Sequence, residues 1–368
     1  MAKKTITKFE DDDVSNALIS RYGDVIKSGT EIVANLGKYS TVSVSPSLDL
    51  ALGGGIREGT CVAMTGDPKT GKTTTALHFA AKCQKAGKEV LYFNTEGRLE
   101  IKNFEGIKGL DPSKIKIIES SDDRILSAEE FLNMIETYVN STPNMVAIID
   151  SVSNMVPQVE LEGEIRTGVR NALPRLLSMF FKRVSGSVSR TRAILIFITH
   201  NIANTGGSRF APAKMADAGN MLQYQVSTNM VITHRSKWEV PKESGNHVGQ
   251  IANWVIKTSS NGTPMAKAES WIRYGVGIDE VQEVIQIACE FRLIKAAGAW
   301  YTIKCALDSM EDKRVVKILK DNDISGEEAA EKFFKFQGVN RLSEFLVENE
   351  SMADLVYEHV RELLGLCE

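Results

Sequence analysis

The segment GDPKTGKTT, residues 66–74, has residue types and spacing suited to binding nucleotide phosphates. It fits the pattern G-x-x-x-x-G-K-[ST], in which glycines let backbone N–H groups point at phosphate oxygens. In this pattern Lys72 is expected to bridge the β- and γ-phosphates, and Thr73 to hold Mg²⁺ through its hydroxyl. The predicted nucleotide-binding residues of the segment are Gly66, Asp67, Pro68, Lys69, Thr70, Gly71, Lys72, Thr73 and Thr74.

Three polar residues follow apolar runs elsewhere in the chain. Asp150 follows MVAII and suits a role beside Mg²⁺, although a strand-ending Asp is also common in ordinary turns. Glu96 follows VLYFN and Thr95, and a carboxylate there can align water for attack on a phosphate, the alternative being a surface loop residue. His200 ends the run ILIFIT and could contact the γ-phosphate, because polar groups at the carboxyl ends of parallel strands face the ligand. A single histidine is often merely structural.

These residues need a parallel sheet to bring them together, and the hydrophobic pattern predicts one. Continuous apolar strands separated by helices indicate an α/β fold with a mostly parallel sheet covered on both faces. Further strands near 229–234, 251–257 and 268–274 have hairpin-like polar turns between them, which predicts an antiparallel extension. The parallel strands are expected at 61–64, 90–93, 145–149 and 193–198, and the helices between them at 72–85, 128–139 and 172–184.

Smaller elements are expected at both ends of this core. Residues 11–27 begin with acids and continue as an amphipathic helix, which is too short to bury its apolar face alone and should pack on another surface such as a neighbouring subunit. From about Gly277 the pattern is mainly helical, with Trp300 and Tyr301 expected in a core or junction. We therefore predict three parts: residues 1–35, an N-terminal oligomerisation element; 36–276, the nucleotide-binding core; and 277–368, a mainly helical domain.

Composition excludes several classes of protein. The 368 residues are 43% hydrophobic and 25% charged, and no run of about 18 apolar residues predicts a membrane span. The start, MAKKTITKFEDDD, lacks the apolar region of a secretory signal. The five cysteines form no C-x-x-C pair and the five histidines no HExxH pattern, so neither a disulfide framework nor a protein-held metal is expected. A cytoplasmic protein is predicted.

Local charge differs from the net charge of −3. Residues 165–216 contain no Asp or Glu and carry nine basic residues. Such a segment favours contact with a polyanion even in an acidic protein, because local potential steers association. The alternative is a solvated basic helix face. The apolar run Met179-Phe180-Phe181 within it is expected to pack a helix on the sheet.

Together these features resemble the RecA family of ATP-dependent DNA recombinases, over almost the whole chain. The resemblance implies DNA-stimulated ATP hydrolysis, helical filaments on single-stranded DNA, and strand exchange with homologous double-stranded DNA in recombination and repair. Departures at several usual positions favour a phage-encoded member. Single-strand-binding and loader proteins are partners that the family implies. The matching segments are SLDLALG (47–53), DSV (150–152), ELEGEI (160–165), LIFI (195–198), GN (219–220) and KAAGAWY (295–301).

The resemblance also assigns roles in the ATP site. It implies that Glu96 is the catalytic glutamate, that Lys72 acts with Thr73 on the phosphates, and that Asp150 is linked to Mg²⁺. His200 stands where bacterial members have a glutamine that senses the γ-phosphate, and its charge would depend on pH near neutrality. Lys257 resembles the first of two lysines that reach the nucleotide of the adjacent subunit. The second would fall near Ser259, so one of these cations is missing.

Two other groups of residues follow from the family pattern. Glu100 occupies a usual acidic position of the adenine pocket, and Phe104 is expected to stack in place of a tyrosine that Asn103 replaces. Two loops, about 157–171 and 201–220, correspond to those that bind single-stranded DNA, through backbone phosphates and without sequence choice. The predicted DNA-binding residues are Arg166, Arg170, Arg175, Arg209, Phe210 and Lys214.

Three other functions remain possible from the residues. A ring-forming DNA helicase motor built on the same core is the first, and the N-terminal element and the EGEI segment disfavour it. A small-molecule kinase would need a lid with catalytic arginines and a compact acceptor pocket, which the sequence does not reveal. A DNA-binding scaffold with a structural nucleotide would not need Glu96 for turnover.

Overall fold

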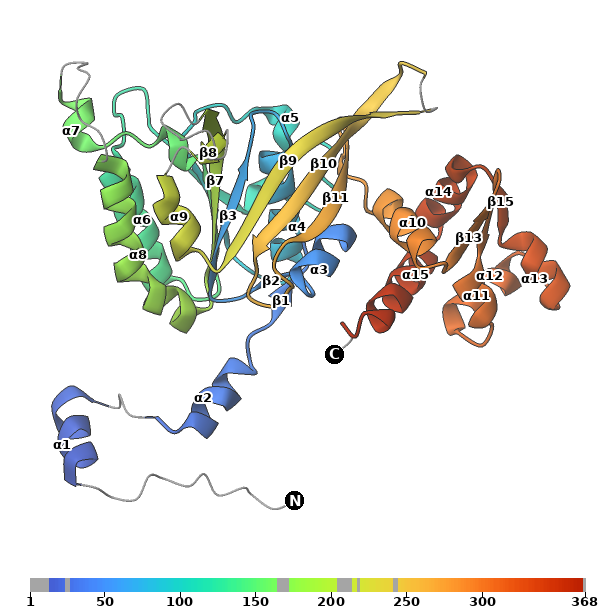
Figure 1. The fold of residues 1–368 in the computed structure, drawn as a ribbon, viewed down its shortest axis with the longest axis horizontal. Coiled ribbons are helices and arrows are strands. Elements are labelled where there is room, and N and C mark those ends of the chain that lie inside the picture. Colours follow the sequence, from blue (N-terminus) through green and yellow to red (C-terminus); the bar gives the residue numbers. More distant parts are fainter. Residues whose placement is uncertain are drawn as a thin grey trace, which may run out of the picture. The chain divides into compact units, whose positions relative to one another are not determined.

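A mixed sheet organises most of the chain in the computed structural model (Figure 1). The structure describes residues 13–23, 27–163, 172–203, 214–216, 219–240 and 244–366. They belong to two compact units, residues 1–40 and residues 41–368, and the large sheet lies in the second. None of the described helices combines the length and apolar character that a membrane crossing needs.

The large sheet has ten strands among the described residues. Their order is β12-β11-β10-β9-β3-β7-β6-β4-β5, with β8 paired to β7. Strands β9, β3, β7, β6, β4 and β5 run parallel, whereas β10, β11 and β12 extend the sheet in antiparallel fashion. The predicted mostly parallel sheet with an antiparallel extension is confirmed. The strands are β3 (Thr60–Gly66), β4 (Val90–Asn94), β5 (Ile115–Ile118), β6 (Val146–Asp150), β7 (Ile194–Ala203), β8 (Lys214–Ala216), β9 (Thr228–Glu239), β10 (His247–Thr258), β11 (Ala266–Arg273) and β12 (Gly277–Ile278).

Helices cover both faces of the parallel strands. Alternate side chains point to opposite faces of a strand, so Val62 and Met64 of β3 join the core beneath α4 while Ala63 joins the core beneath α6 and α8. The long β9–β10 pair extends beyond its neighbours at one end of the sheet (Figure 1). The helices of this part are α3 (Pro46–Leu52), α4 (Lys72–Lys85), α5 (Ile101–Phe104), α6 (Ala128–Ser141), α7 (Gln158–Leu161), α8 (Ala172–Thr191) and α9 (Gly219–Gln225). A short pair, β1 (Thr41–Val42) and β2 (Ile56–Arg57), flanks α3.

The apolar run Met179-Phe180-Phe181 of α8 is only partly buried. Phe180 and Phe181 are buried against Phe197 of β7, with ring centroids 6.3 and 5.1 Å away. Met179 is 53% exposed, so its predicted packing on the sheet is wrong. One residue in a helix turns the side chain by about 100°, and Met179 falls outside the stripe that faces the strands.

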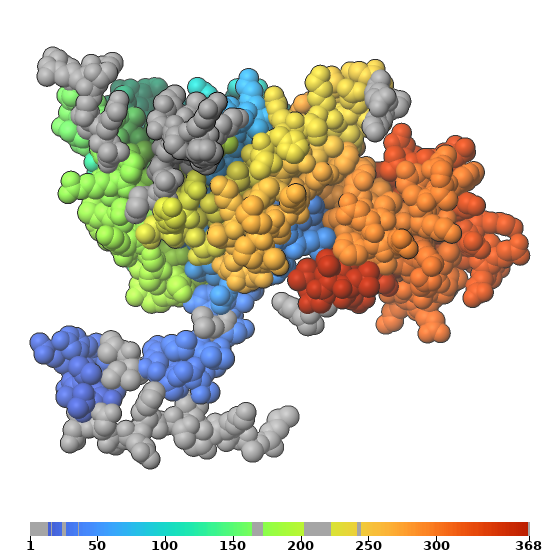
Figure 2. Space-filling view, in the orientation of Figure 1, coloured from blue at the N-terminus to red at the C-terminus, as the bar shows by residue number. Residues whose placement is uncertain are grey.

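The C-terminal region, coloured dark orange to red in Figure 2, has a separate hydrophobic core. It is mainly helical as predicted, but it also contains a three-stranded antiparallel sheet that the sequence reading omitted. Tyr301 packs on this core, whereas Trp300 is 42% exposed with Lys335 Nζ 5.3 Å from its ring centroid, which corrects the expectation for Trp300. The elements are α10 (Glu280–Glu290), β13 (Ile294–Ala297), β14 (Trp300–Ile303), α11 (Lys304–Asp308), α12 (Lys313–Asp321), α13 (Glu327–Phe333), β15 (Lys335–Gln337), α14 (Val339–Glu348) and α15 (Glu350–Leu363).

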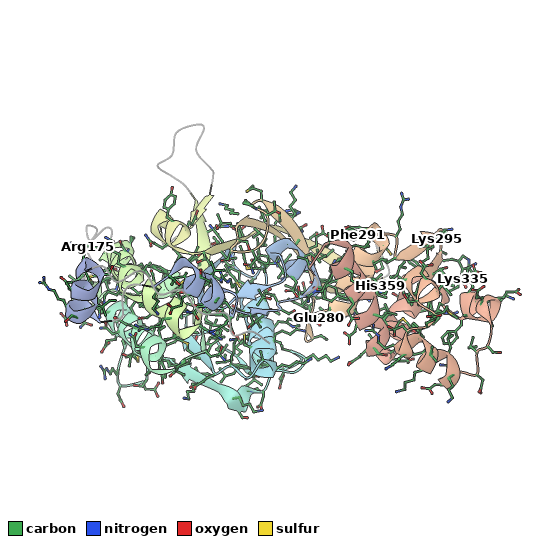
Figure 3. All side chains as sticks on the ribbon, turned by 90° about the horizontal axis from the view of Figure 1, so that it is seen from below. Arg175, Glu280, Phe291, Lys295, Lys335 and His359 are labelled. Atoms are coloured by element: carbon green, nitrogen blue, oxygen red, sulfur yellow. The ribbon has the colours of Figure 1, made fainter. Side chains whose placement is uncertain are left out.

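Buried polar contacts join this region to the sheet-bearing part. On α10, Glu283 accepts a hydrogen bond from the backbone N–H of Ser47 at 2.9 Å, and Glu280 (labelled in Figure 3) contacts His78 of α4 at 2.7 Å. On α15, the Tyr357 hydroxyl lies 3.3 Å from Oδ2 of Asp49. Burial raises the pKa of Glu283 to about 8 and that of Asp49 to about 7, against the hydrogen bonds that these carboxyl groups accept. Both carboxyl groups therefore keep their protons to a higher pH in the folded chain than in the unfolded chain.

The described residues of the first unit form two short helices, α1 (Asp13–Tyr22) and α2 (Gly29–Leu36). Helix α2 begins after Ser28, whose side chain accepts a hydrogen bond from the N–H of Glu31 at 3.1 Å. Among the side chains of this unit that the structure describes, six large apolar ones are exposed. They are Val14, Leu18, Ile19, Tyr22, Ile32 and Val33.

Candidate functional site

The phosphate-loop segment joins β3 to α4. Helix α4 follows Gly71, which has a φ of 104° and supplies no side-chain cap, so the first N–H groups of α4 are not satisfied by a capping side chain. Lys72 is buried, and its Nζ donates to the carbonyls of Gly66 at 2.9 Å and Asp67 at 2.8 Å. Burial lowers the pKa of Lys72 to about 8, although the charges of Asp150, Glu96 and Asp67 oppose this effect. The loop thus places a cation and a helix N-terminus at one point.

Asp150 links the loop to the end of β6. Its Oδ2 accepts hydrogen bonds from the Thr73 hydroxyl at 2.6 Å and the Tyr92 hydroxyl at 2.7 Å. Its Oδ1 is buried and has no hydrogen-bond partner among the described residues. A hydroxyl beside a carboxylate with a spare oxygen is a donor set that suits Mg²⁺ when phosphate supplies further oxygens. Across the described part of the chain, no group of three or more His, Cys, Asp or Glu residues could hold a metal independently of a nucleotide.

Glu96 is held at the carboxyl end of β4. The backbone N–H groups of Thr95 and Glu96 donate to the Asp150 carbonyl at 3.0 and 3.2 Å, which fixes the turn that carries Glu96. The Glu96 carboxylate lies 2.9 Å from Arg98 Nη1 and 3.6 Å from His200 Nε2. Glu96 therefore lies between a guanidinium and an imidazole, on the same edge as Asp150.

His200 is level with Gly66, because these two residues are register partners in the β3–β7 pair. The backbone N–H of His200 donates to Ser153 Oγ at 3.1 Å, and its Nδ1 is buried without a hydrogen-bond partner among the residues described. The neighbouring Asn201 donates to Asp67 Oδ1 at 3.2 Å, so the end of β7 also contacts the loop. Lys72, Thr73, Glu96, Asp150 and His200 are thus brought together, although the chain separates the first from the last by more than a hundred residues.

Lys257 lies away from this cluster. Gln250, seven residues earlier on β10, contacts the loop at Lys69, and seven extended residues span roughly 23 Å. Lys257 is exposed, and the nearby Ser259 hydroxyl donates to the Leu52 carbonyl at 3.1 Å and accepts from Gly262 N. Ser259 therefore organises a turn where the family pattern has a second lysine.

The predicted adenine-pocket residues have structural contacts of their own. The Glu100 backbone N–H donates to the Asn103 side chain at 2.7 Å, and the Glu100 carboxylate pairs with Lys102 at 2.5 Å. The first of these contacts belongs to a capping box at the start of α5. Phe104 is partly buried against the core beneath α4, so its ring is anchored beside the helix that follows the loop.

Most predicted DNA-binding side chains cannot be placed. Arg166, Arg170, Arg209 and Phe210 lie outside the described residues, and for Lys214 only the backbone, in β8, is described. Arg175 is exposed in the first turn of α8 and is labelled in Figure 3. It is the member of the set whose side chain can be assessed, and it is free of any ion pair within the described residues.

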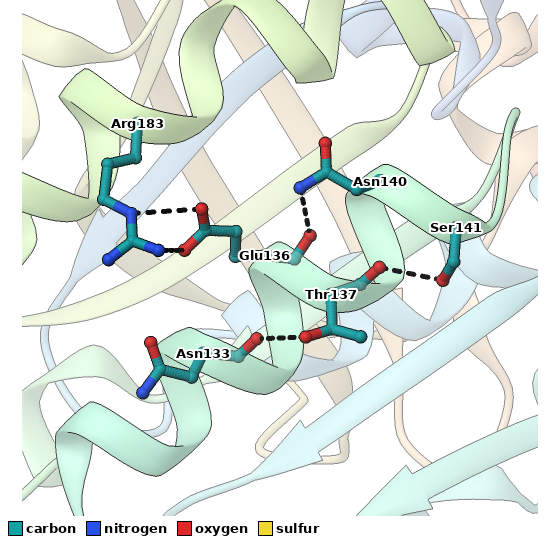
Figure 4. Close-up of a pocket in the computed structure, with 6 residues that line it drawn as sticks. All are labelled: Asn133, Glu136, Thr137, Asn140, Ser141 and Arg183. Atoms are coloured by element: carbon teal, nitrogen blue, oxygen red, sulfur yellow. Dashed lines mark hydrogen bonds and ion pairs between the residues drawn. The ribbon is translucent and has the colours of Figure 1, made fainter.

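An open groove on the surface is unrelated to the loop. It lies between α6 and α8, has a volume of about 580 Å³, and is lined by polar side chains of both helices (Figure 4). Arg183 closes an ion pair with Glu136 there, at 2.8 Å between Nη2 and Oε2 and 3.1 Å between Nε and Oε1. Glu136 therefore neutralises the charge of Arg183.

Several residues of the site were missed by the sequence reading. The sequence did indicate a polar contact for Tyr92, because a tyrosine in an apolar strand needs a hydrogen-bond partner once it is buried. The contact of Arg98 with Glu96 could have been predicted from the sequence, because the two residues are only two positions apart. Arg235 and Gln250 gave no signal, since their contacts with Lys69 depend on long-range strand pairing.

A parallel sheet, a phosphate loop between β3 and α4, and acidic groups at the neighbouring strand ends define a phosphate-loop nucleotide-binding protein of the α/β class. The family model described as RecA N-terminal domain matches residues 17–279, more than two thirds of the chain. The chain therefore belongs to the RecA family.

Curated relatives agree with this assignment. The chain is 30% identical over 281 residues to Protein RecA of Chloroherpeton thalassium, covering 76% of this chain and 75% of the relative. It is 27% identical over 324 residues to Protein RecA of Halalkalibacterium halodurans, covering 86% and 88%. It is also 27% identical over 346 residues to Protein RecA of Oleidesulfovibrio alaskensis, covering 92% and 96%. The similarity thus extends into the C-terminal region.

Proposed function

We propose that this protein is a DNA-dependent ATPase of the recombinase type, which forms helical filaments on single-stranded DNA and catalyses homologous pairing and strand exchange. The observation that carries the proposal is the position of Glu96. It lies at the strand end next to Asp150, which contacts Thr73 of the loop, in a chain of the RecA family. A carboxylate there suits an enzyme that hydrolyses nucleotide, and a scaffold would have no use for it.

Each side chain has a defined task in this scheme. Lys72 leaves the carbonyls of Gly66 and Asp67 to bind the phosphates, and the first N–H groups of α4 bind the same anion. Thr73 and Asp150 hold the Mg²⁺ ion, which when bound neutralises phosphate charge. Glu96 accepts a proton from the attacking water. The His200 imidazole donates a hydrogen bond to the γ-phosphate.

The proposed filament completes the site with a second subunit. Lys257 is exposed and far along β10 from its own loop, which suits a cation that serves the neighbour's nucleotide. Residues 1–35 are proposed to dock on the next subunit, because their helices expose apolar side chains that a separate unit of this size cannot bury. Residues 36–276 then form the ATPase core and residues 277–368 the C-terminal domain, in a protein that acts in the cytoplasm.

The proposed DNA surface consists of the two loops near residues 157–171 and 201–220, together with Arg175 just after the first loop. Their basic residues would bind backbone phosphates and release counterions, which gives affinity without base specificity. Nucleotide binding and DNA binding would both favour the same subunit arrangement, so each ligand raises the affinity for the other.

The test is ATP turnover with and without single-stranded DNA, combined with electron microscopy of the assemblies. We expect DNA to stimulate turnover and helical filaments to form with ATP. An unchanged turnover rate would contradict the coupling. Closed rings that unwind duplexes would instead favour the helicase motor.

A further inference from the structure

Strands β9, β10 and β11 form a platform under the phosphate loop. Arg235 on β9, Gln250 on β10 and Ile272 on β11 share one face: Gln250 is the register partner of Ile272, and Arg235 pairs with Ala252, the residue two positions after Gln250. Such directly opposite and diagonal positions bring side chains of adjacent strands into contact. The side chains of all three residues lie close to the loop residues Lys69 and Gly71.

The platform binds one particular carbonyl of the loop. The Lys69 carbonyl accepts a hydrogen bond from Arg235 Nη1 at 3.2 Å and lies 3.4 Å from Gln250 Nε2. Arg235 Nη1 also donates to Gln250 Oε1 at 3.0 Å, so the two side chains form a closed network with the loop. Gln250 is buried, and Arg235 reaches it from the exposed part of β9.

The Lys69 backbone has a conformation that needs support. Its φ is 60°, in the left-handed region that costs a non-glycine residue about 1 kcal/mol. Because a trans peptide bond directs its C=O and N–H groups to opposite sides, a Lys69 carbonyl turned toward β9 and β10 turns the Thr70 N–H away from them. That side of the loop is where the phosphates would lie.

Packing holds the loop from the same direction. A Cβ atom placed on Gly71 would come within 2.2 Å of Ile272 Cδ1 and 3.4 Å of Gln250 Nε2. The loop therefore lies directly on the platform at Gly71 and is hydrogen-bonded to it at Lys69. Arg235, Gln250 and Ile272 are separated from the loop by at least 160 residues of chain.

We propose that Arg235, acting with Gln250, is a positioning residue that holds the phosphate loop in its anion-binding conformation before nucleotide arrives. Arg235 does this through the Lys69 carbonyl and not through contact with the nucleotide. The inference rests on the nucleotide binding of the proposed function. It adds to that function a requirement on β9 and β10, outside the nucleotide-contacting segments.

The experiment compares Arg235→Met with Lys237→Met. Lys237 is exposed two residues along the same face of β9, and its ammonium lies 3.4 Å from His247 Nε2, with no contact to the loop among the described interactions. Both changes remove one positive charge, but only the first removes the hydrogen bond to Lys69. The readouts are the Kd of a ribose-labelled fluorescent ATP analogue, the saturated turnover rate, and hydrogen exchange of the loop amides without nucleotide.

For Arg235→Met we expect about tenfold weaker binding of the analogue, faster exchange of the loop amides, and an unchanged saturated rate, because a lost hydrogen bond from a charged donor has about this effect. Lys237→Met should change Kd less than twofold. Arg235→Lys should recover part of the affinity, since an ammonium can bind one acceptor but lacks the planar fork.

Two results would overturn the proposal. Equal losses in the two methionine variants would show a general charge effect, and wild-type exchange in Arg235→Met would show that the loop needs no support from Arg235. Hydrogen exchange is measured without nucleotide or DNA. It therefore tests the positioning role even if the protein proves not to be a DNA-stimulated ATPase.

Discussion

The hydroxyl of Thr73 lies 2.6 Å from Oδ2 of Asp150, across 77 residues of chain. This contact joins the first turn of α4 to the end of β6, and it leaves Asp150 Oδ1 buried without a partner among the described residues. The arrangement has the oxygen donors that Mg²⁺ prefers. It also links the helix that receives phosphate to the strand next to the one that carries Glu96.

Replacing Thr73 with Val should weaken the affinity for Mg²⁺ without unfolding the chain. We expect the Mg²⁺ concentration for half-maximal ATP turnover to rise about tenfold, as for the loss of one ligand worth about 1.4 kcal/mol. The matched control is Thr75→Val on the same helix, whose buried hydroxyl has no partner among the described residues. Identical magnesium titrations for both variants would remove Thr73 from the metal site.

Replacing Glu96 with Gln should suppress hydrolysis and preserve binding. A general base contributes about 10²–10⁴-fold to a rate, so turnover should fall at least a hundredfold while the fluorescent ATP analogue and DNA still bind. Glu105→Gln is the control, because it makes the same chemical change at an exposed position nearby. Wild-type turnover in Glu96→Gln would exclude this residue as the base.

The sequence predicted which residues lie at the strand ends of the site, but not the strand order or the side chains that contact the loop. Glu96, Asp150 and His200 could be placed on one edge because the carboxyl ends of parallel strands meet there, whatever the strand order. The order itself, with β6 between β4 and β7, and the contacts of Arg235 and Gln250 with Lys69 depend on which strands pair. A hydrophobic pattern contains no information on that choice.

The short strands of the C-terminal region were also missed by prediction from the sequence. Its helices were predicted from their amphipathic pattern, but β13 to β15 are four, four and three residues long. Strands this short offer too few positions for an alternating pattern to be distinguished from a loop. The AGAWY segment was identified by resemblance alone, and its place on two paired strands came from the structure.

Replacing Arg175 with Gln should lower the salt dependence of single-stranded DNA binding. Each phosphate contact contributes about 0.7 to the slope of log affinity against log salt concentration, so the slope should decrease by about that amount. Lys182→Gln is the matched control, since Lys182 is exposed on the same helix roughly 10 Å away. A slope unchanged by Arg175→Gln would place the DNA surface elsewhere.

Replacing Glu283 with Gln should flatten the dependence of folding stability on pH. Burial, together with the charge of Glu280, raises the pKa of Glu283 from 4.5 to about 8, against a hydrogen bond from Ser47. The folded chain therefore holds a proton that the unfolded chain releases above about pH 4.5. The stability that this proton contributes is fully present below about pH 4.5 and is lost as the pH rises to 8. Between pH 5 and 8 the wild type should lose free energy of unfolding on the order of a few kcal/mol, measured by urea denaturation. In Glu283→Gln the decline should be shallower and should level off above pH 7, because Asp49, with a pKa of about 7, is half ionised there. Glu290→Gln, at an exposed position of α10, should retain the wild-type slope, and an equal slope in Glu283→Gln would mean that Glu283 ionises normally in the folded protein.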